Sequence, residues 1–128
     1  MVQLDYKDPV SVRAEAVLTN SYVTGTVLTQ TRFHNQLIVL IKITLGSLTS
    51  VEMKLEFSPD NTTWFQEVID AANSLSQFTT SQGDRTFTAS GNYRIAIPIS
   101  DNFIRISAKG TGTVTDSLCT IDAIISHI

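Results

Sequence analysis

The residues of this chain that could do chemistry are two histidines, one cysteine and a scatter of carboxylates. His34 lies between Phe33 and Asn35, and His127 is the penultimate residue. Neither stands beside a nucleophile motif such as Gly-x-Ser-x-Gly. We therefore expect both to be solvent-exposed loop and tail histidines, with no catalytic residue and no enzyme activity.

The single cysteine excludes two kinds of site. With Cys119 alone, neither an intrachain disulfide nor a cysteine-based zinc site can form. Its neighbours Leu118 and Ile121 belong to an apolar run, where a free cysteine usually packs as a small buried hydrophobe. We predict a core position for Cys119.

Two glutamates share one face of an expected strand. Glu52 and Glu56 lie four residues apart, which is roughly 13 Å along a strand. Glycosidase carboxylate pairs need a separation of about 5–9.5 Å. Lys54 lies between the two glutamates, so the pattern indicates a solvated charge ladder.

The remaining oxygen-rich pairs coincide with turn signals. Asp60-Asn61 and Asp101-Asn102 could offer oxygen ligands to calcium, but both stand where hairpins need turn formers. We expect no metal and no cofactor in this protein.

Aromatic side chains offer a different chemistry, the stacking of sugar rings. Trp64, Tyr93 and Tyr22 are the candidates for such a platform. Adjacent Trp64 and Phe65 must point to opposite faces of a strand, so at least one of them is expected in the core. The platform remains an alternative prediction.

Strands must position these residues, because the dominant pattern along the chain has a period of two. From Val51 to Phe57 apolar and charged residues alternate strictly, which places Val51, Met53, Leu55 and Phe57 on one face. The preceding segment 36–45 is apolar on both faces in its first half. With 46–50 as a hairpin loop, 58–62 as a turn and 63–69 as the next strand, we predict a three-stranded meander.

Further strands follow at short intervals over 85–89, 93–99, 103–109 and 117–126. Pro98 cannot donate to a ladder, so it marks a strand end or a sheet edge. The stretch 70–77 has the only helical pattern and is too short to trust. These strands predict an all-β fold, an antiparallel two-sheet β-sandwich or jelly-roll-like single domain.

The first thirty residues differ from the rest. Residues 1–13 are polar and lack a sustained period, so we predict an extended N-terminal arm over 1–13 and a β-sandwich domain over 14–128. Residues 22–30 have the pattern of a strand, in which Gly25 marks a bulge or a close approach.

Charge and hydropathy exclude two classes of partner. The net charge is −3, and no two of the nine Lys and Arg residues are adjacent, so nucleic-acid binding is not expected. The longest apolar run, 37–41, is far too short to span a bilayer, and the N-terminus does not resemble a signal peptide. The charged fraction of 16% is below the usual ~25%, which favours a surface covered by partners.

Three segments carry a resemblance to a known group of proteins: 35–40, 46–67 and 91–113. The strings Ser-Pro-Asp-Asn-Thr-Thr-Trp and Tyr-Arg-Ile-Ala-Ile-Pro, followed by Ile-Arg-Ile-Ser, resemble small β-sandwich virion proteins of tailed bacteriophages. Asn61 stands where that pattern usually has Gly, a position that a left-handed turn tolerates.

The resemblance implies a capsid decoration protein or another accessory protein of the virion, assembled in the host cytoplasm, with the major capsid protein or other virion proteins as partners. It supplies no catalytic residues. The alternative is a carbohydrate- or receptor-binding module of a phage tail or fibre.

An interface is predicted from the segment that is apolar on both faces. Ile38 and Leu40 share the face opposite Leu37, Val39 and Ile41, so a two-layer sandwich leaves one set facing outward. We name Ile38, Leu40, Tyr6 and Val10 as candidate interface residues. The cover is expected to come from the arm, from a symmetry-related copy or from the capsid, and we predict a homo-oligomer.

Overall fold

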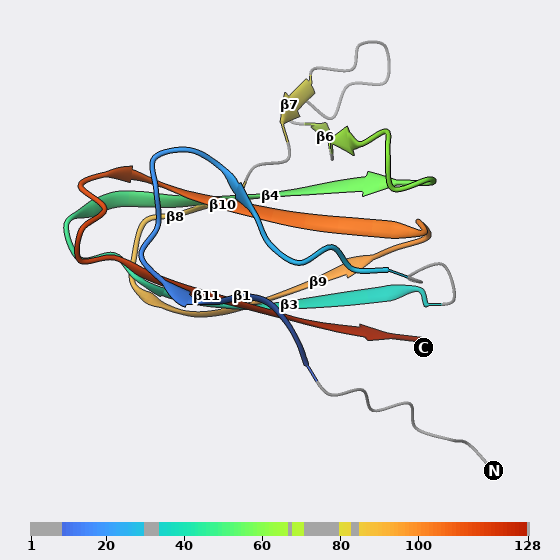
Figure 1. Ribbon diagram of the computed structural model, residues 1–128, viewed down its shortest axis with the longest axis horizontal. Helices are drawn as coiled ribbons and strands as arrows, with labels where there is room; N and C mark the ends of the chain where they lie inside the picture. Colours follow the sequence, from blue (N-terminus) through green and yellow to red (C-terminus); the bar gives the residue numbers. More distant parts are fainter. Residues whose placement is uncertain (1–8, 30–33, 67, 71–79, 83–84, 128) are drawn as a thin grey trace.

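Alternating apolar and polar residues produce strands that bury one face, and two antiparallel sheets bring those faces together (Figure 1). The computed structural model describes residues 9–29, 34–66, 68–70, 80–82 and 85–127. Within these ranges there is no helix, so none is long and apolar enough to cross a membrane. The predicted all-β sandwich is confirmed.

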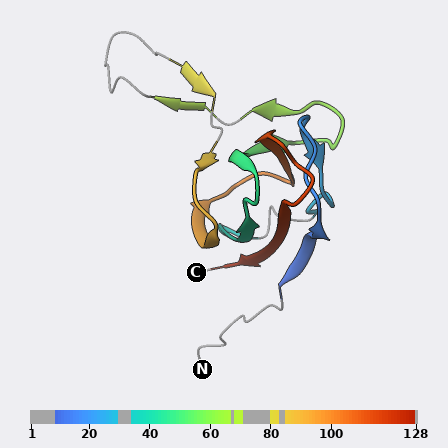
Figure 2. The ribbon, with the colours of Figure 1, turned by 90° about the vertical axis from the view of Figure 1, so that its left-hand side faces the viewer.

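We call the two layers sheet A and sheet B. Sheet A contains, in order, β1 (Val10–Ala16), β11 (Leu118–Ser126), β3 (Gln36–Thr44) and β9 (Gly91–Pro98). Sheet B contains β2 (Val23–Thr24), β10 (Phe103–Gly112), β4 (Leu48–Ser58) and β5 (Phe65–Gln66), and β8 (Arg85–Phe87) also pairs with β4. A separate two-stranded ribbon, β6 (Val68–Asp70) with β7 (Thr80–Gln82), projects from the sandwich on the sheet B side (Figures 1 and 2).

The predicted strand faces are those of the structure. In β4, Val51, Met53 and Leu55 are fully buried between the sheets, while the charged residues between them point outward. The core side chains of the other long strands alternate in the same way: Ile104, Ile106 and Ala108 of β10, and Cys119, Ile121 and Ala123 of β11. Pro98 is the last residue of β9, an edge strand, as its missing N–H requires.

The predicted meander is wrong for its first pair of strands, whereas its second pair, β4 with β5, is present in the structure. Strand β3 pairs with β11 and β9 in sheet A, whereas β4 pairs with β10, β5 and β8 in sheet B. The segment between them therefore crosses from one sheet to the other. Gly46 makes the crossing possible with a φ of 58°, and a Cβ there would lie 2.5 Å from the carbonyl oxygen of Asp116.

The same crossing is fixed by Asp116, whose carboxylate accepts hydrogen bonds from the N–H of Ser47 at 2.9 Å and from its hydroxyl at 3.1 Å. These backbone and side-chain bonds lower the pKa of Asp116. A short polar connection is compatible with a hairpin and with such a crossing, so its composition alone could not separate the two.

The N-terminal boundary also differs from the prediction. Strand β1 begins at Val10, inside the range 1–13 predicted as an arm, and pairs with β11. Residues 1–8 lie outside the described residues, as do residues 71–77 of the short helical pattern. The strand predicted over 22–30 is shorter than expected, since β2 contains two residues. The strand predicted over 63–69 is divided between β5 and β6.

Gly25 makes the close approach predicted for it. Its N–H donates to the carbonyl of Ile106 in sheet B at 3.0 Å, and the next residue, Thr26, donates to the carbonyl of Val12 in sheet A at 2.9 Å. A Cβ on Gly25 would lie 2.4 Å from that same Val12 oxygen. The chain thus closes this side of the sandwich by bonding to both sheets within two residues.

Candidate binding surfaces

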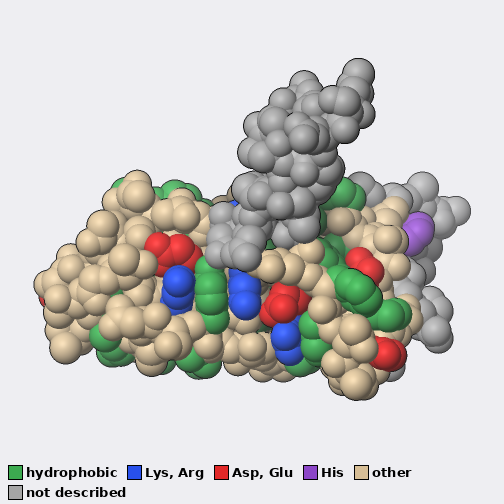
Figure 3. Space-filling model, turned by 90° about the horizontal axis from the view of Figure 1, so that it is seen from above, with side chains coloured by type: hydrophobic (Ala, Val, Ile, Leu, Met, Phe, Trp, Pro, Cys, Tyr) green, Lys and Arg blue, Asp and Glu red, His purple; other side chains and the backbone are tan. Residues whose placement is uncertain are grey.

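The outward side of sheet B carries a continuous set of charged and aromatic side chains, which we call the charged face. Figure 3 shows acidic, basic and hydrophobic side chains alternating across it. Its members come from the segment before β2, from β4, from β10 and from the turn before β5: Tyr22, Glu52, Lys54, Glu56, Trp64, Arg105 and Lys109.

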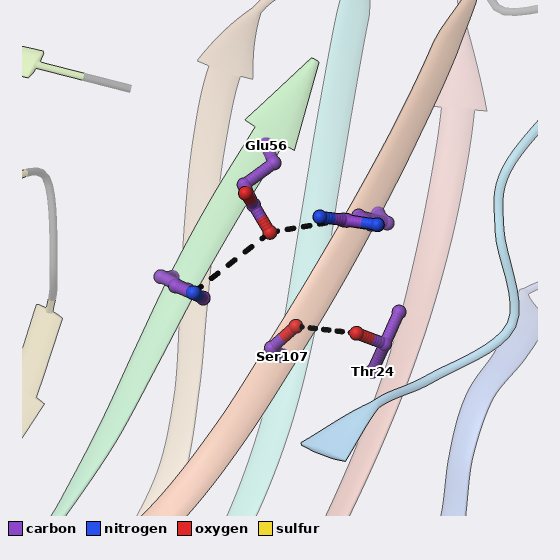
Figure 4. A network of polar contacts seen from close by, with 5 residues as sticks. Thr24, Glu56 and Ser107 are labelled. Atoms are coloured by element: carbon purple, nitrogen blue, oxygen red, sulfur yellow. Dashed lines mark hydrogen bonds and ion pairs between the residues drawn. The ribbon is translucent and has the colours of Figure 1, made fainter. Parts of the chain in front are cut away.

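Glu56 lies at the centre of the charged face. Its carboxylate accepts a hydrogen bond from Nε of Arg105 on the neighbouring strand at 2.9 Å and lies 3.9 Å from Nζ of Lys54 (Figure 4). Residues 56 and 105 are direct partners in the β4–β10 register, so the sheet itself places the two groups together. Only 13% of the Glu56 side chain is exposed, which is less solvation than the predicted charge ladder implies.

Glu52 belongs to a second set of contacts on the same face. Its carboxylate accepts hydrogen bonds from the hydroxyls of Ser50 at 2.6 Å and Thr111 at 2.9 Å. A further hydroxyl pair, Thr24 with Ser107 at 3.0 Å, joins β2 to β10 (Figure 4). The two glutamates therefore bind separate partners and do not form a carboxylate pair.

Two aromatic rings of the charged face are covered by cations. The Tyr22 ring has Nζ of Lys54 at 4.6 Å and Nζ of Lys109 at 4.8 Å from its centroid. The guanidinium carbon of Arg105 lies 4.3 Å from the centroid of Trp64. These contacts join residues from distant parts of the sequence, and no local sequence signal could have identified them.

The three predicted platform residues are not brought together. Tyr22 and Trp64 lie on the charged face, whereas Tyr93 is paired with the buried Ile41 and packs against the core. The Tyr93 ring lies 4.8 Å from that of Phe87, and its hydroxyl donates to the carbonyl of Ala89 at 2.7 Å. A sugar could therefore not stack on all three aromatic rings at once.

Neither Trp64 nor Phe65 is a core residue, contrary to the expectation for this adjacent pair. Trp64 is half-buried beneath Arg105, and Phe65 has an exposed fraction of 59%. Phe65 belongs to the short edge strand β5, and Trp64 directly precedes it. Phe65 is the most exposed large hydrophobic side chain among the described residues.

In the turn at 58–63, side-chain oxygens accept hydrogen bonds from the backbone N–H groups of the same turn. The buried hydroxyl oxygen of Ser58 accepts hydrogen bonds from the N–H groups of Asp60 and Asn61. The Asp60 carboxylate accepts from the N–H groups of Thr63 and Thr62 at 2.9 Å each, and these bonds lower the pKa of Asp60. Among the described residues there is no group of three or more acidic, histidine or cysteine side chains arranged to hold a metal.

The outward side of sheet A carries a small apolar cluster, which we call the apolar face. Ile38 and Leu40 point away from the core and are half-buried, while Leu37, Val39 and Ile41 are completely buried. The strand register places Ile124 and Ala96 on either side of Ile38. One apolar set of β3 therefore faces outward, as the sequence requires.

The other two candidate interface residues do not join this cluster. Val10 is 44% exposed and lies opposite Ala123, whose side chain is buried on the inner side of the sheet. Direct partners share a face, so Val10 points to the opposite side from Ile38 and Leu40. Tyr6 lies outside the described residues.

The remaining reactive side chains are placed as follows. Cys119 is fully buried, and burial raises the pKa of its thiol to about 11, so a reactive thiolate is disfavoured. His127 is exposed, as expected, whereas His34 is half-buried. The segments that carry them meet at one end of sheet A, where the N–H of Asn35 donates to the carbonyl of Ser126.

No family model and no curated protein matches the sequence. Among solved structures the chain is similar to the SPBc2 prophage-derived protein YomS, with 16% sequence identity and a TM-score of 0.57. The match covers 98% of each chain. The two proteins share a fold over essentially their whole lengths.

Proposed function

We propose that this protein is a non-enzymatic structural component of a bacteriophage virion, bound to the head as a decoration protein. The observation that carries the proposal is the apolar face, in which Ile38 lies between Ile124 and Ala96, and Leu40 lies between the charged Asp122 and Arg94. Its place on a regular sheet suits contact with another protein. The fold shared with a prophage-derived protein and the resemblance of the strand and turn strings support a phage origin.

The charged face supports a role without chemistry. Glu56 binds Arg105, Glu52 binds two hydroxyls, and Tyr22 lies against two lysines. Side chains held by one another in this way form a fixed surface, whereas catalysis needs a base or nucleophile directed at a substrate. A decoration protein needs only to bind the assembled shell, which it then stabilises by mass action.

Mass spectrometry of purified virions of the phage that encodes this chain tests the proposal. We expect the chain in many copies per particle, retained after tails are removed from heads. Its absence from the particle contradicts a virion role, and its presence in tails alone contradicts head decoration.

A binding measurement on isolated heads tests the apolar face. Heads lacking the chain should bind the added protein and withstand a higher temperature before releasing DNA. Leu40→Asp should abolish this binding while the variant remains folded. The matched control is Thr44→Asp, an exposed outward position on the same strand, and we expect it to bind like the wild type.

The carbohydrate-binding alternative has a separate test. Binding to a glycan array that disappears in folded Trp64→Ala would favour that alternative over the decoration role. The present geometry gives it little support, because cations already cover the rings of Tyr22 and Trp64.

A further inference from the structure

The free side of β9 is the long regular edge of the sandwich. Within the described residues no strand pairs with β9 on the side away from β3. Its register with β3 is unbroken from Pro98 to Gly91. Edges of this kind present unpaired N–H and C=O groups and act as templates for another strand.

The other edges of the two sheets are shorter or irregular. The register of β1 with β11 shifts twice, between Ser11 and Arg13 and between Arg13 and Ala16. At the edges of sheet B, β2 and β5 have two residues each and β8 has three. Short strands, bulges, charged side chains and proline all hinder edge pairing. Strand β9 is neither short nor bulged, and its charged residue and its proline are single: Arg94 within the strand and Pro98 at its end.

The ladder shows which groups of β9 face outward. Pro98 has no N–H and still lies opposite Gln36, and the following N–H, of Ile99, donates to the carbonyl of Asn35 at 3.1 Å. Residues that bond to a neighbouring strand alternate with residues that point away from it. The backbone groups of Ile97, Ile95 and Tyr93 therefore face β3. Those of Ala96, Arg94 and Asn92 face the open side.

The side chains of β9 also indicate a missing neighbour. Tyr93 and Ile95 point toward the core and pack against it, yet both remain half-exposed at the open side of the sandwich. A strand placed beside β9 would cover them.

We propose that a second copy of this chain pairs with β9 through its own β9, in antiparallel orientation about a two-fold axis at Ile95. The two four-stranded sheets A would then form one continuous sheet across the dimer. Arg94 of each copy lies opposite Ala96 of the other, and Tyr93 lies opposite Ile97. The neighbouring register centred on Arg94 would place two arginines directly opposite each other, which is unfavourable.

In this dimer the outward backbone N–H and C=O groups of β9 form hydrogen bonds. The N–H groups of Arg94 and Ala96 meet the carbonyls of Ala96 and Arg94 of the second copy, and the N–H of Asn92 meets the carbonyl of Pro98. Pro98 lies at the end of the paired segment, where its missing N–H removes no central bond. The inference concerns the isolated chain and does not depend on a role in the virion.

Cysteine cross-linking tests the register. In the proposed dimer the two Ile95 residues form a non-hydrogen-bonded pair, with Cα atoms about 4.5 Å apart. This distance lies within the ~4.4–6.8 Å that a disulfide spans. Ile95→Cys should therefore form a covalent dimer on mild oxidation, with twice the 14.0 kDa mass of one chain. Cys119 is buried with a raised pKa and should not interfere.

Arg94→Cys is the matched control. In the proposed register its two copies are offset by two residues along the strands and lie roughly 8 Å apart, beyond the reach of a disulfide. Efficient cross-linking at position 94 with none at 95 would overturn the register.

Variants of the exposed Ala96 test the pairing without a cysteine. By analytical ultracentrifugation we expect a wild-type dimer. Ala96→Glu should lower the dimer dissociation constant severalfold, because each new carboxylate faces an arginine, and Ala96→Lys should raise it severalfold. Ala96→Pro removes an N–H on the open side and should give a folded monomer, with folding checked by circular dichroism. A wild-type monomer at high concentration, or a dimer insensitive to all three changes, would overturn the proposal.

Discussion

At the scale of single residues, adjacent positions of β4 should respond very differently to truncation. Leu55 is fully buried, so Leu55→Ala should lower the free energy of unfolding by about 2–5 kcal/mol, and Ile106→Ala should do the same from the facing position of β10. Urea denaturation measures both. Equal losses for Leu55→Ala and Lys54→Ala would mean that the strand faces are assigned backwards.

Glu56→Ala should have an effect between that of a core residue and that of a fully solvated one. On a solvated face Glu56→Ala would cost under about 0.5 kcal/mol. The structure instead predicts roughly 1–2 kcal/mol, because the change leaves Arg105 without its carboxylate partner on a half-buried surface. Lys54→Ala is the control in the same measurement. Its nitrogen is 3.9 Å from Glu56, so we expect a smaller loss.

The pH dependence of stability should follow the turn carboxylates. Hydrogen bonds from Thr63 and Thr62 lower the pKa of Asp60, and those from Ser47 lower the pKa of Asp116. A lowered folded-state pKa stabilises the fold above the ordinary aspartate pKa of about 3.9, and this stabilisation disappears as pH falls through the lowered value.

Urea denaturation between about pH 2 and 6 measures this effect. The difference in unfolding free energy between wild type and Asp116→Asn should be constant at the upper end and shrink toward the lower end. A difference that grows as pH falls would contradict the assigned direction.

The sequence predicts which side of a strand a side chain points to, but it does not predict which side chain on another strand it contacts. A period of two determines that Leu55 points inward and Glu56 outward, because successive strand side chains alternate. Which cation meets Glu56 depends on the pairing of β4 with β10, whose partner residue Arg105 is 49 positions away. The cation–π contacts of Tyr22 and Trp64 arise in the same way.

At the scale of elements, the segment directly after β2 is expected to be sensitive to a single added methyl group. Gly25→Ala should lower the free energy of unfolding by roughly 1–3 kcal/mol, because its Cβ would meet the backbone oxygen of Val12 at 2.4 Å. Thermal unfolding followed by circular dichroism measures the loss. Gly91→Ala is the control, since its nearest neighbour is the Tyr93 ring at 3.3 Å, and a similar loss there would contradict the backbone clash as the cause.

The turn after β4 predicts changes in both directions. Asn61 has a φ of 60°, a region where glycine is unstrained and β-branched residues are not. Asn61→Gly should leave stability unchanged or slightly raised, and Asn61→Val should lower it by about 1–2 kcal/mol. Differential scanning calorimetry separates them, and a stable Asn61→Val variant would contradict the left-handed assignment.

The two connections next to β4 differ in how well the sequence predicts them. The turn at 58–62 was predictable because Pro, Asp and Asn have conformational preferences of their own. The connection at 46–50 was not, because its direction depends on whether β4 meets β3 or β10. Both strands are apolar on an inner face, so either pairing buries the same side chains. In the structure the crossing is held by the hydrogen bond from the N–H of Ser47 to Asp116, 69 positions away in the sequence.

At the scale of the whole molecule, folding should require no bound ion. The Asp60 carboxylate is already bonded to backbone N–H groups, so calcium would have to displace them. We expect the same thermal midpoint with and without a chelator such as EDTA. A midpoint lowered by several degrees would contradict this account.

The order of strands in sheet A has a consequence for the growing polypeptide. The first described strand, β1, pairs only with β11, which also separates it from β3. On the ribosome, the backbone groups of β1 and β3 that bond to β11 therefore remain unpaired until residues 118–126 have emerged. A nascent chain released before that point would lack the centre of one sheet, and its exposed strand edges would make it a substrate for chaperones and proteases.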